Sequence, residues 1–164
     1  MDRHHGDRNA MGSTGQRDPD RPQSRPSGLR ATQRFMDAYV EWHLAILDHQ
    51  PVDILANVSW LPACFAGQYD ALWTDGRIEA VLGAFLRNGV ALEISSGFRL
   101  PGMHFLRLAK AAGLRFCFGS NGRYPAMGKL DYSLQMARDL QLTSADFWQP
   151  GPDGPRAART RARP

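Results

Sequence analysis

Residues 74–94 read TDGRIEAVLGAFLRNGVALEI and contain the pattern that decides the fold. Apolar side chains recur there at the three- and four-residue spacing of one helix face. These positions are Ile78, Val81, Leu82, Phe85 and Leu86. Thr74 suits the N-cap of this helix, and Asn88 followed by Gly89 is a typical stop. The short apolar run after the stop, residues 90–94, predicts a buried strand.

The same alternation of helix and strand extends along the chain in both directions. We expect further helices at about residues 35–47, 102–112 and 129–141, and further strands at 52–56 and 114–118. Strands that alternate with helices at this spacing are parallel and are joined by right-handed crossovers. The sequence therefore predicts an α/β fold with about three parallel strands. Three strands cannot close a barrel, so either strands are missing or another chain supplies them.

The two ends of the chain differ from its centre in composition. Residues 1–30 carry six Arg and four Asp, and residues 151–164 carry four Arg and one Asp, so the ends account for charges of +2 and +3. The total charge of +4 then leaves −1 for residues 31–150. Because both ends lack large apolar side chains, we expect them to be disordered tails around one domain. The basic C-terminal tail lacks interleaved aromatics, so nucleic acid is not an expected partner.

Several classes of protein are excluded by composition. No apolar run approaches the roughly 18 residues that a membrane span needs, and the N-terminus has no apolar signal core. Cys64 and Cys117 are too few for a disulfide framework or a Cys-rich zinc site, and we interpret both as reduced thiols. The expected compartment is the cytoplasm.

Three stretches of the centre together carry a resemblance to a known family. They are residues 52–57 (VDILAN), residues 91–95 (ALEIS) and the helix–strand segment at 105–123, which ends in FCFGSNGR. In order and interval they resemble the second half of a PHP domain, named after the polymerase and histidinol phosphatase superfamily. The resemblance implies that residues 31–150 are part of a distorted (β/α)7 barrel. It also implies a cluster of divalent metal ions at the barrel mouth, where a bound water attacks a phosphate ester.

The positions that hold metals in that family are occupied differently here. Asn57 stands where the family has His, Asn121 where it has Asp, and Arg123 where it has His. The family's N-terminal His-x-His is absent, and His4 and His5 are adjacent in the tail. An amide is a weak neutral ligand and a guanidinium is a permanent cation, so we expect no metal ligand set. Glu93 remains as the candidate catalytic carboxylate, with an ion pair to Arg99 or Arg123 as its alternative role.

Two functional hypotheses follow from these residues. The first is a PHP-related phosphoesterase relative that is truncated and catalytically impaired. The second is a metal-free binding or regulatory module for a small anion, because the predicted strand ends gather donors. The candidate ligand-binding residues are Asn57, Ser95, Arg99, Asn121 and Arg123. Exposed sheet edges favour a homo-oligomer, and a gene product with a missing N-terminal half is a further interpretation.

Three other features have both a structural and a functional interpretation. His104 near a helix start is either a surface side chain or an imidazole at the mouth. Cys117 is expected in the core rather than as a nucleophile. The aromatic segment that contains Trp60, Phe65 and Trp73 is expected to cover the sheet edge, with a lid over the mouth as the alternative.

Overall fold

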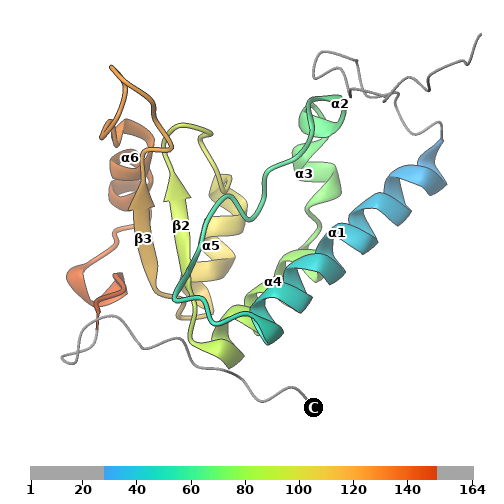
Figure 1. The fold of residues 1–164 in the computed structure, drawn as a ribbon, viewed down its shortest axis with the longest axis horizontal. Helices are drawn as coiled ribbons and strands as arrows, with labels where there is room; N and C mark the ends of the chain where they lie inside the picture. The colour runs from blue at the N-terminus through green and yellow to red at the C-terminus, as the bar shows by residue number, and fades with distance from the viewer. Residues whose placement is uncertain (1–27, 151–164) are drawn as a thin grey trace, which may run out of the picture.

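The computed structural model describes residues 28–150 of the chain. The two expected disordered tails lie almost entirely outside the described residues, as do His4 and His5. The elements, in chain order, are α1 (Leu29–His49), β1 (Ile54–Leu55), α2 (Ala63–Ala66), α3 (Tyr69–Leu72), α4 (Asp75–Asn88), β2 (Ala91–Ser95), α5 (Met103–Ala111), β3 (Phe116–Gly119), α6 (Asp131–Asp139) and the 3-10 turn η1 (Ser144–Asp146) (Figure 1).

The strands form one open parallel sheet in the order β1-β2-β3. Leu55 is paired with Leu92, and Leu92 is paired in turn with Phe116, so these three side chains lie in one row across the sheet. Helices connect consecutive strands (Figure 1). The α/β class and the parallel three-stranded sheet predicted from the sequence are therefore confirmed.

The helix–strand segment quoted first forms as predicted. Helix α4 begins directly after Thr74, although the Thr74 side chain makes no capping hydrogen bond. Gly89 ends the helix in the left-handed conformation, with φ of 61°. This conformation directs the N–H of Val90 onto the carbonyl oxygen of Phe85 at 3.1 Å. Glycine adopts this backbone region without steric cost, which explains the tight turn into β2.

The two faces of the sheet have different surroundings. Leu92, Ile94 and Phe116 belong to the main core cluster, together with buried residues of α1, α4, α5 and α6. Glu93 and Cys117 alternate with them, are paired in register, and are only partly buried. No helix crosses in front of β2 and β3 in Figure 1. The expectation that Cys117 lies in the core is therefore wrong, because its strand position directs it to the opposite face.

The aromatic segment between β1 and α4 contains the short helices α2 and α3. Phe65 and Trp73 from this segment are buried in the core cluster. The hydroxyl of Tyr39 on α1 donates to the carbonyl oxygen of Trp60 at 2.7 Å. The buried rings and this hydrogen bond therefore attach the segment to the core and to α1. Strand β1, which precedes the segment, spans only two residues.

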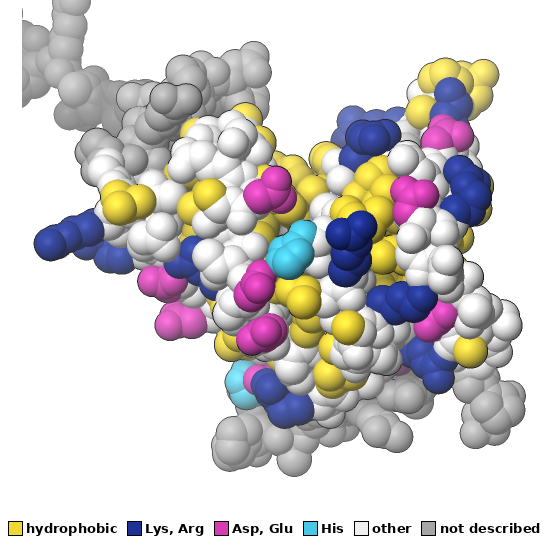
Figure 2. All heavy atoms as spheres, turned by 180° about the vertical axis from the view of Figure 1, so that it is seen from behind, with side chains coloured by type: hydrophobic (Ala, Val, Ile, Leu, Met, Phe, Trp, Pro, Cys, Tyr) yellow, Lys and Arg dark blue, Asp and Glu magenta, His cyan; other side chains and the backbone are white. Residues whose placement is uncertain are grey.

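Both signs of charge are interspersed over the face of the molecule seen from behind (Figure 2). Apolar side chains lie between the charged groups on this face, and the outline is hollowed at its upper edge.

Within residues 28–150, none of the helices has both the length and the apolar character that a membrane crossing requires.

Candidate functional site

A pocket of about 260 Å³ lies where the loops after β2 and β3 meet the start of α6. Both loops follow the carboxyl ends of parallel strands, which is where α/β sheets usually bind ligands (Figure 1). The residues that line the pocket are Ser96, Gly97, Arg99, Ser120, Gly122, Ala126, Lys129, Asp131 and Tyr132. We call it the mouth pocket.

Arg99 is placed in the mouth pocket by a tight turn after β2. The N–H of Ser95 donates to the carbonyl oxygen of Leu100 at 2.7 Å, and the N–H of Leu100 donates back at 3.1 Å. Inside this turn Arg99 has a φ of 55°, a left-handed conformation that is uncommon for a residue with a Cβ atom. Its guanidinium carbon lies 5.0 Å from the ring centroid of Tyr132, within the range of a cation–π contact.

Hydrogen bonds attach the first turn of α6 to the end of β2. The N–H of Ser133 donates to the hydroxyl oxygen of Ser96 at 2.9 Å, and the Ser133 hydroxyl donates to the carbonyl oxygen of Ile94 at 2.6 Å. The Tyr132 hydroxyl donates to the carbonyl oxygen of Pro101 at 2.6 Å. Because all three bonds are made by buried α6 side chains or their backbone, they fix the wall of the mouth pocket.

The charges of the mouth pocket are not neutralised by one another. Arg99 and Lys129 supply two positive charges and Asp131 supplies one negative charge. Within residues 28–150, none of these three side chains forms an ion pair. The pocket lining therefore carries a net charge of +1, and the start of α6 adds the partial positive charge of a helix N-terminus. This arrangement favours an anionic group.

Glu93 lies beside the mouth pocket and is paired with backbone rather than with a cation. Its Oε2 accepts a hydrogen bond from the N–H of Asn57 at 3.3 Å. Neither Arg99 nor Arg123 forms an ion pair with it among the described residues, so the ion pair considered from the sequence is not formed. Burial raises the pKa of the Glu93 carboxyl, and the Asn57 hydrogen bond offsets this only in part.

Gly119 makes room for the Glu93 carboxyl. A Cβ atom on Gly119 would lie 1.5 Å from Glu93 Oε1. The carboxyl therefore lies over the end of β3, and any side chain at residue 119 would displace it.

The structure brings only one of the predicted site residues into the mouth pocket. Arg99 lines it, whereas Asn57 and Glu93 form a separate pair, and Ser95 is fully buried with a hydroxyl that has no hydrogen-bond partner in residues 28–150. Asn121 and Arg123 are exposed and do not line the pocket. The loop after β3 directs them outward.

Sequence reasoning missed the contribution of α6 and of the residue Lys129 just before it. Lys129, Tyr132 and Ser133 respectively supply a charge, a ring and an anchor at the mouth. The predicted helix at 129–141 already followed a predicted strand, and the start of such a helix lies close to the carboxyl edge of the sheet. This order of strand and helix was the sequence feature that could have identified the start of α6 as part of the site.

The donor set does not fit the metal cluster that the resemblance implies. Within residues 28–150, no group of three His, Cys, Asp or Glu side chains is close enough to hold a metal ion. Cys117, which is paired with Glu93 across the sheet, does not supply a metal ligand in place of the absent carboxylates and imidazoles. Burial and the charge of Glu93 raise the pKa of its thiol to about 12. Cys117 therefore remains a neutral thiol, which is a poor ligand and a poor nucleophile.

His104 makes a surface contact and does not line the mouth pocket. Its Nε2 lies 2.6 Å from Oδ1 of Asp75, and both side chains are exposed. The pair links the first turns of α5 and α4, which supports the structural interpretation of this residue.

Glu93→Gln is expected to stabilise the fold modestly at pH 7. The folded pKa of Glu93 lies above its ordinary value of 4.5, so ionisation costs stability as the pH rises through the folded pKa. As the pH falls below 4.5 both states become protonated and this cost fades. Thermal melts of the protein and of Glu93→Gln at pH 4 and pH 7 measure the difference. Glu79→Gln on the exposed surface of α4 is the matched control, and an equal gain in that variant would contradict the prediction.

The chain matches no protein-family model, and it shows no significant similarity to a curated protein or to a solved structure.

Proposed function

We propose that residues 28–150 form a metal-free binding module for a small ligand that carries a phosphate or carboxylate group. One observation supports this function above all. Arg99 and Lys129, which form no ion pair within residues 28–150, line the same 260 Å³ pocket at the carboxyl end of the sheet. A guanidinium and an ammonium group that line one pocket are suited to an anion.

The two cations have different roles in the proposed site. The contact with Tyr132 holds the guanidinium plane of Arg99, so fewer rotamers are lost when it binds an oxyanion. Lys129 follows the loop after β3 and supplies a point charge. Ser120 lies in the same lining, and its hydroxyl group adds a polar contact.

Asp131 restricts the ligands that this pocket accepts. Its carboxylate lines the pocket and repels a second negative group on the ligand. A ligand that joins one anionic group to a hydroxyl or ammonium donor satisfies all three charged side chains. Such a ligand is therefore expected to bind more tightly than a simple oxyanion.

The scaffold proposed for this module is part of a PHP-like barrel. The parallel strand order, the helical crossovers and the position of Glu93 near the carboxyl end of β2 support that relation. Hydrolysis by a metal-activated water has no support from the described donor set. An open edge of the three-stranded sheet favours pairing with a second copy or with another chain.

Phosphate is expected to raise the melting temperature of the protein, and Arg99→Gln is expected to reduce the affinity about tenfold or more. A hydrogen-bonded charge contributes about 1.5–3 kcal/mol, and 1.4 kcal/mol corresponds to a factor of ten. Ligand at 100 times its Kd stabilises a protein by about 2.7 kcal/mol, which is readily detected in a thermal melt. Titration of phosphate and of glycolate into both proteins gives the affinities.

Arg107→Gln is the control because it removes the same charge from an exposed position on α5. An equal loss of affinity in both variants would mean that only the overall charge matters, and the proposed site would be wrong. Turnover of an aryl phosphate that requires manganese would instead favour the phosphoesterase hypothesis.

A further inference from the structure

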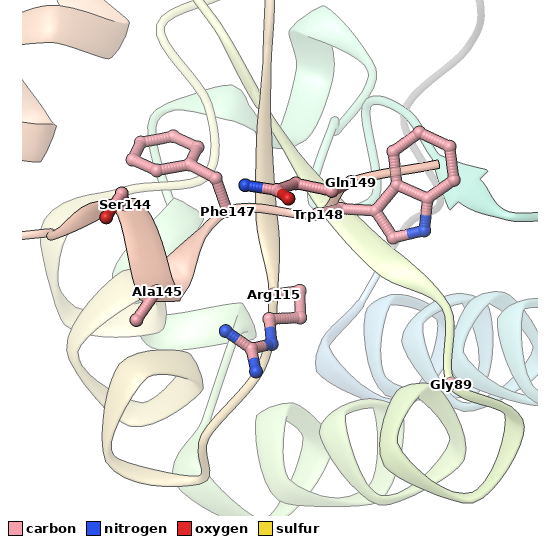
Figure 3. Close-up of a pocket in the computed structure, with 7 residues that line it drawn as sticks. All are labelled: Gly89, Arg115, Ser144, Ala145, Phe147, Trp148 and Gln149. Atoms are coloured by element: carbon pink, nitrogen blue, oxygen red, sulfur yellow. The ribbon is translucent and has the colours of Figure 1, made fainter. Parts of the chain in front are cut away.

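A second pocket lies at the amino end of the sheet, opposite the mouth pocket (Figure 3). Its volume is about 460 Å³, within the range of pockets that hold small molecules. It is lined by Gly89, Arg115, Ser144, Ala145, Phe147, Trp148 and Gln149. These residues come from the turn before β2, the start of β3 and the segment that begins at η1, and we call the space the base pocket.

Backbone pairing with β3 holds one wall of the base pocket in place. Phe147 forms a parallel bridge with Phe116, and the N–H of Trp148 donates to the carbonyl oxygen of Phe116 at 2.9 Å. The ring of Phe147 packs edge-on against Phe118, with 4.9 Å between ring centroids. The segment that contains Phe147 and Trp148 is therefore hydrogen-bonded to the β3 edge of the sheet.

The turn at the entrance of this segment is fixed by a capping box. The Asp146 carboxylate accepts hydrogen bonds from the N–H and the hydroxyl of Thr143, at 2.7 and 2.9 Å. These two bonds lower the pKa of Asp146. Asp146 does not line the base pocket, and its Oδ2 already accepts both of these bonds. Its charge interacts with Arg115 from outside the pocket lining.

Two hydrogen-bond donors of the base pocket, the Arg115 guanidinium and the Trp148 indole N–H, have no hydrogen-bond partner within residues 28–150. Arg115 is the sole charged lining residue, and within residues 28–150 it forms no ion pair. The indole of Trp148 is partly buried, yet among the described residues it makes no ring contact and donates no hydrogen bond. In Figure 3 the rings of Phe147 and Trp148 point to opposite sides of the view. The Arg115 side chain lies below and between them, and Gln149 lies above Arg115.

We propose that the base pocket binds a small organic anion whose acidic group is attached to a flat aromatic ring. The guanidinium of Arg115 binds the acidic group through its paired donors. The ring packs against Trp148, because an aromatic face contributes affinity that an exposed cation alone does not. This site is independent of the mouth pocket and of the function proposed for it.

Sequence charge favours an external ligand over the C-terminal end of the chain as the occupant. Residues 151–164 follow the pocket segment directly and carry four Arg and one Asp. A segment with this positive charge is repelled by Arg115, whereas an anion is attracted by it.

Naphthyl phosphate is the probe, and the indole N–H resonances of the full-length protein are the readout. The chain has four Trp residues, so a nitrogen–proton correlation spectrum gives four indole signals, and Trp148→Phe identifies that of Trp148. We expect naphthyl phosphate to shift this signal in a saturable way. Inorganic phosphate and naphthol, which each lack one half of the probe, are expected to bind at least tenfold more weakly. Naphthoate, compared directly, shows whether the acidic group is a phosphate or a carboxylate.

Arg115→Gln is expected to weaken the probe binding that the Trp148 signal reports about tenfold or more, while Arg107→Gln leaves it unchanged. Arg115→Lys keeps the charge without the planar fork, so its affinity should be intermediate. Circular dichroism checks that each variant is folded. The proposal is overturned if the Trp148 signal does not respond at millimolar probe, if Arg115→Gln and Arg115→Lys both bind normally, or if Arg99→Gln abolishes the response.

Discussion

Trp73→Ala is expected to lower the free energy of unfolding by about 3–5 kcal/mol, the usual cost of removing a large buried aromatic side chain. Trp73 is 2% exposed and is among the largest fully buried side chains of the described residues. Its ring packs edge-on against Phe105, with 5.5 Å between centroids, and its indole N–H donates to the carbonyl oxygen of Ser59 at 3.0 Å. Since domains of this size are stable by about 5–15 kcal/mol, much of the stability is lost. Urea denaturation followed by circular dichroism measures the change.

Two further Trp variants separate the causes of that loss. Trp73→Phe keeps an aromatic ring but leaves the buried carbonyl group of Ser59 without its donor, so we expect an intermediate cost of about 1–3 kcal/mol. Trp42 on α1 is 57% exposed, and Trp42→Ala is the matched control with an expected cost below about 1 kcal/mol. Equal costs for Trp73→Ala and Trp42→Ala would contradict the buried position of Trp73.

Gly97→Ala is expected to destabilise the protein by about 1–3 kcal/mol and to weaken anion binding in the mouth pocket. A Cβ atom on Gly97 would lie 2.5 Å from the carbonyl oxygen of Ser120 and 3.1 Å from that of Asn121. Both atoms belong to the backbone, so the loop after β3 has to move as a whole. Gly97 and Ser120 both line the mouth pocket, and this movement changes its shape. Thermal melts with and without phosphate measure both effects.

Gly76→Ala is the matched control for Gly97→Ala, and it is expected to change the stability in the opposite direction. Gly76 lies in the first turn of α4, and a Cβ atom there meets no other atom within 4 Å. Alanine restricts the unfolded chain and favours the helix, so we expect a gain of about 0.4–1 kcal/mol. A gain of stability in Gly97→Ala as well would show that the two loops are not in contact.

The sequence alone determined the local structure of the centre of the chain. The apolar spacing of α4, the left-handed Gly89 and the apolar run of β2 depend on interactions within a few residues. The capping box of Thr143 and Asp146 likewise joins residues only three apart in the sequence. Because a helix between two strands makes parallel pairing the natural connection, the sheet type also followed from the order of the elements.

The position of the mouth pocket could be predicted from the sequence, but the residues that line it could not. The prediction that polar groups gather at the carboxyl ends of the strands included Arg99, which lines the mouth pocket. It also included Asn121 and Arg123, because a residue after a strand was assumed to face the mouth. The path of a loop depends on contacts with distant segments, such as Gly97 against the carbonyl oxygen of Ser120, and sequence spacing does not contain these contacts.

Tertiary structure decided the partners of the charged and aromatic side chains. Glu93 is paired with the backbone of Asn57 because Gly119 leaves space for the carboxyl, not because a cation is near. Tyr132 stacks under Arg99 because three hydrogen bonds attach α6 to the end of β2 and the loop after it. Helices and strands are encoded by neighbours in sequence and could therefore be predicted, whereas the two pockets are made by residues far apart in the chain, which meet only when the sheet and its helices pack together.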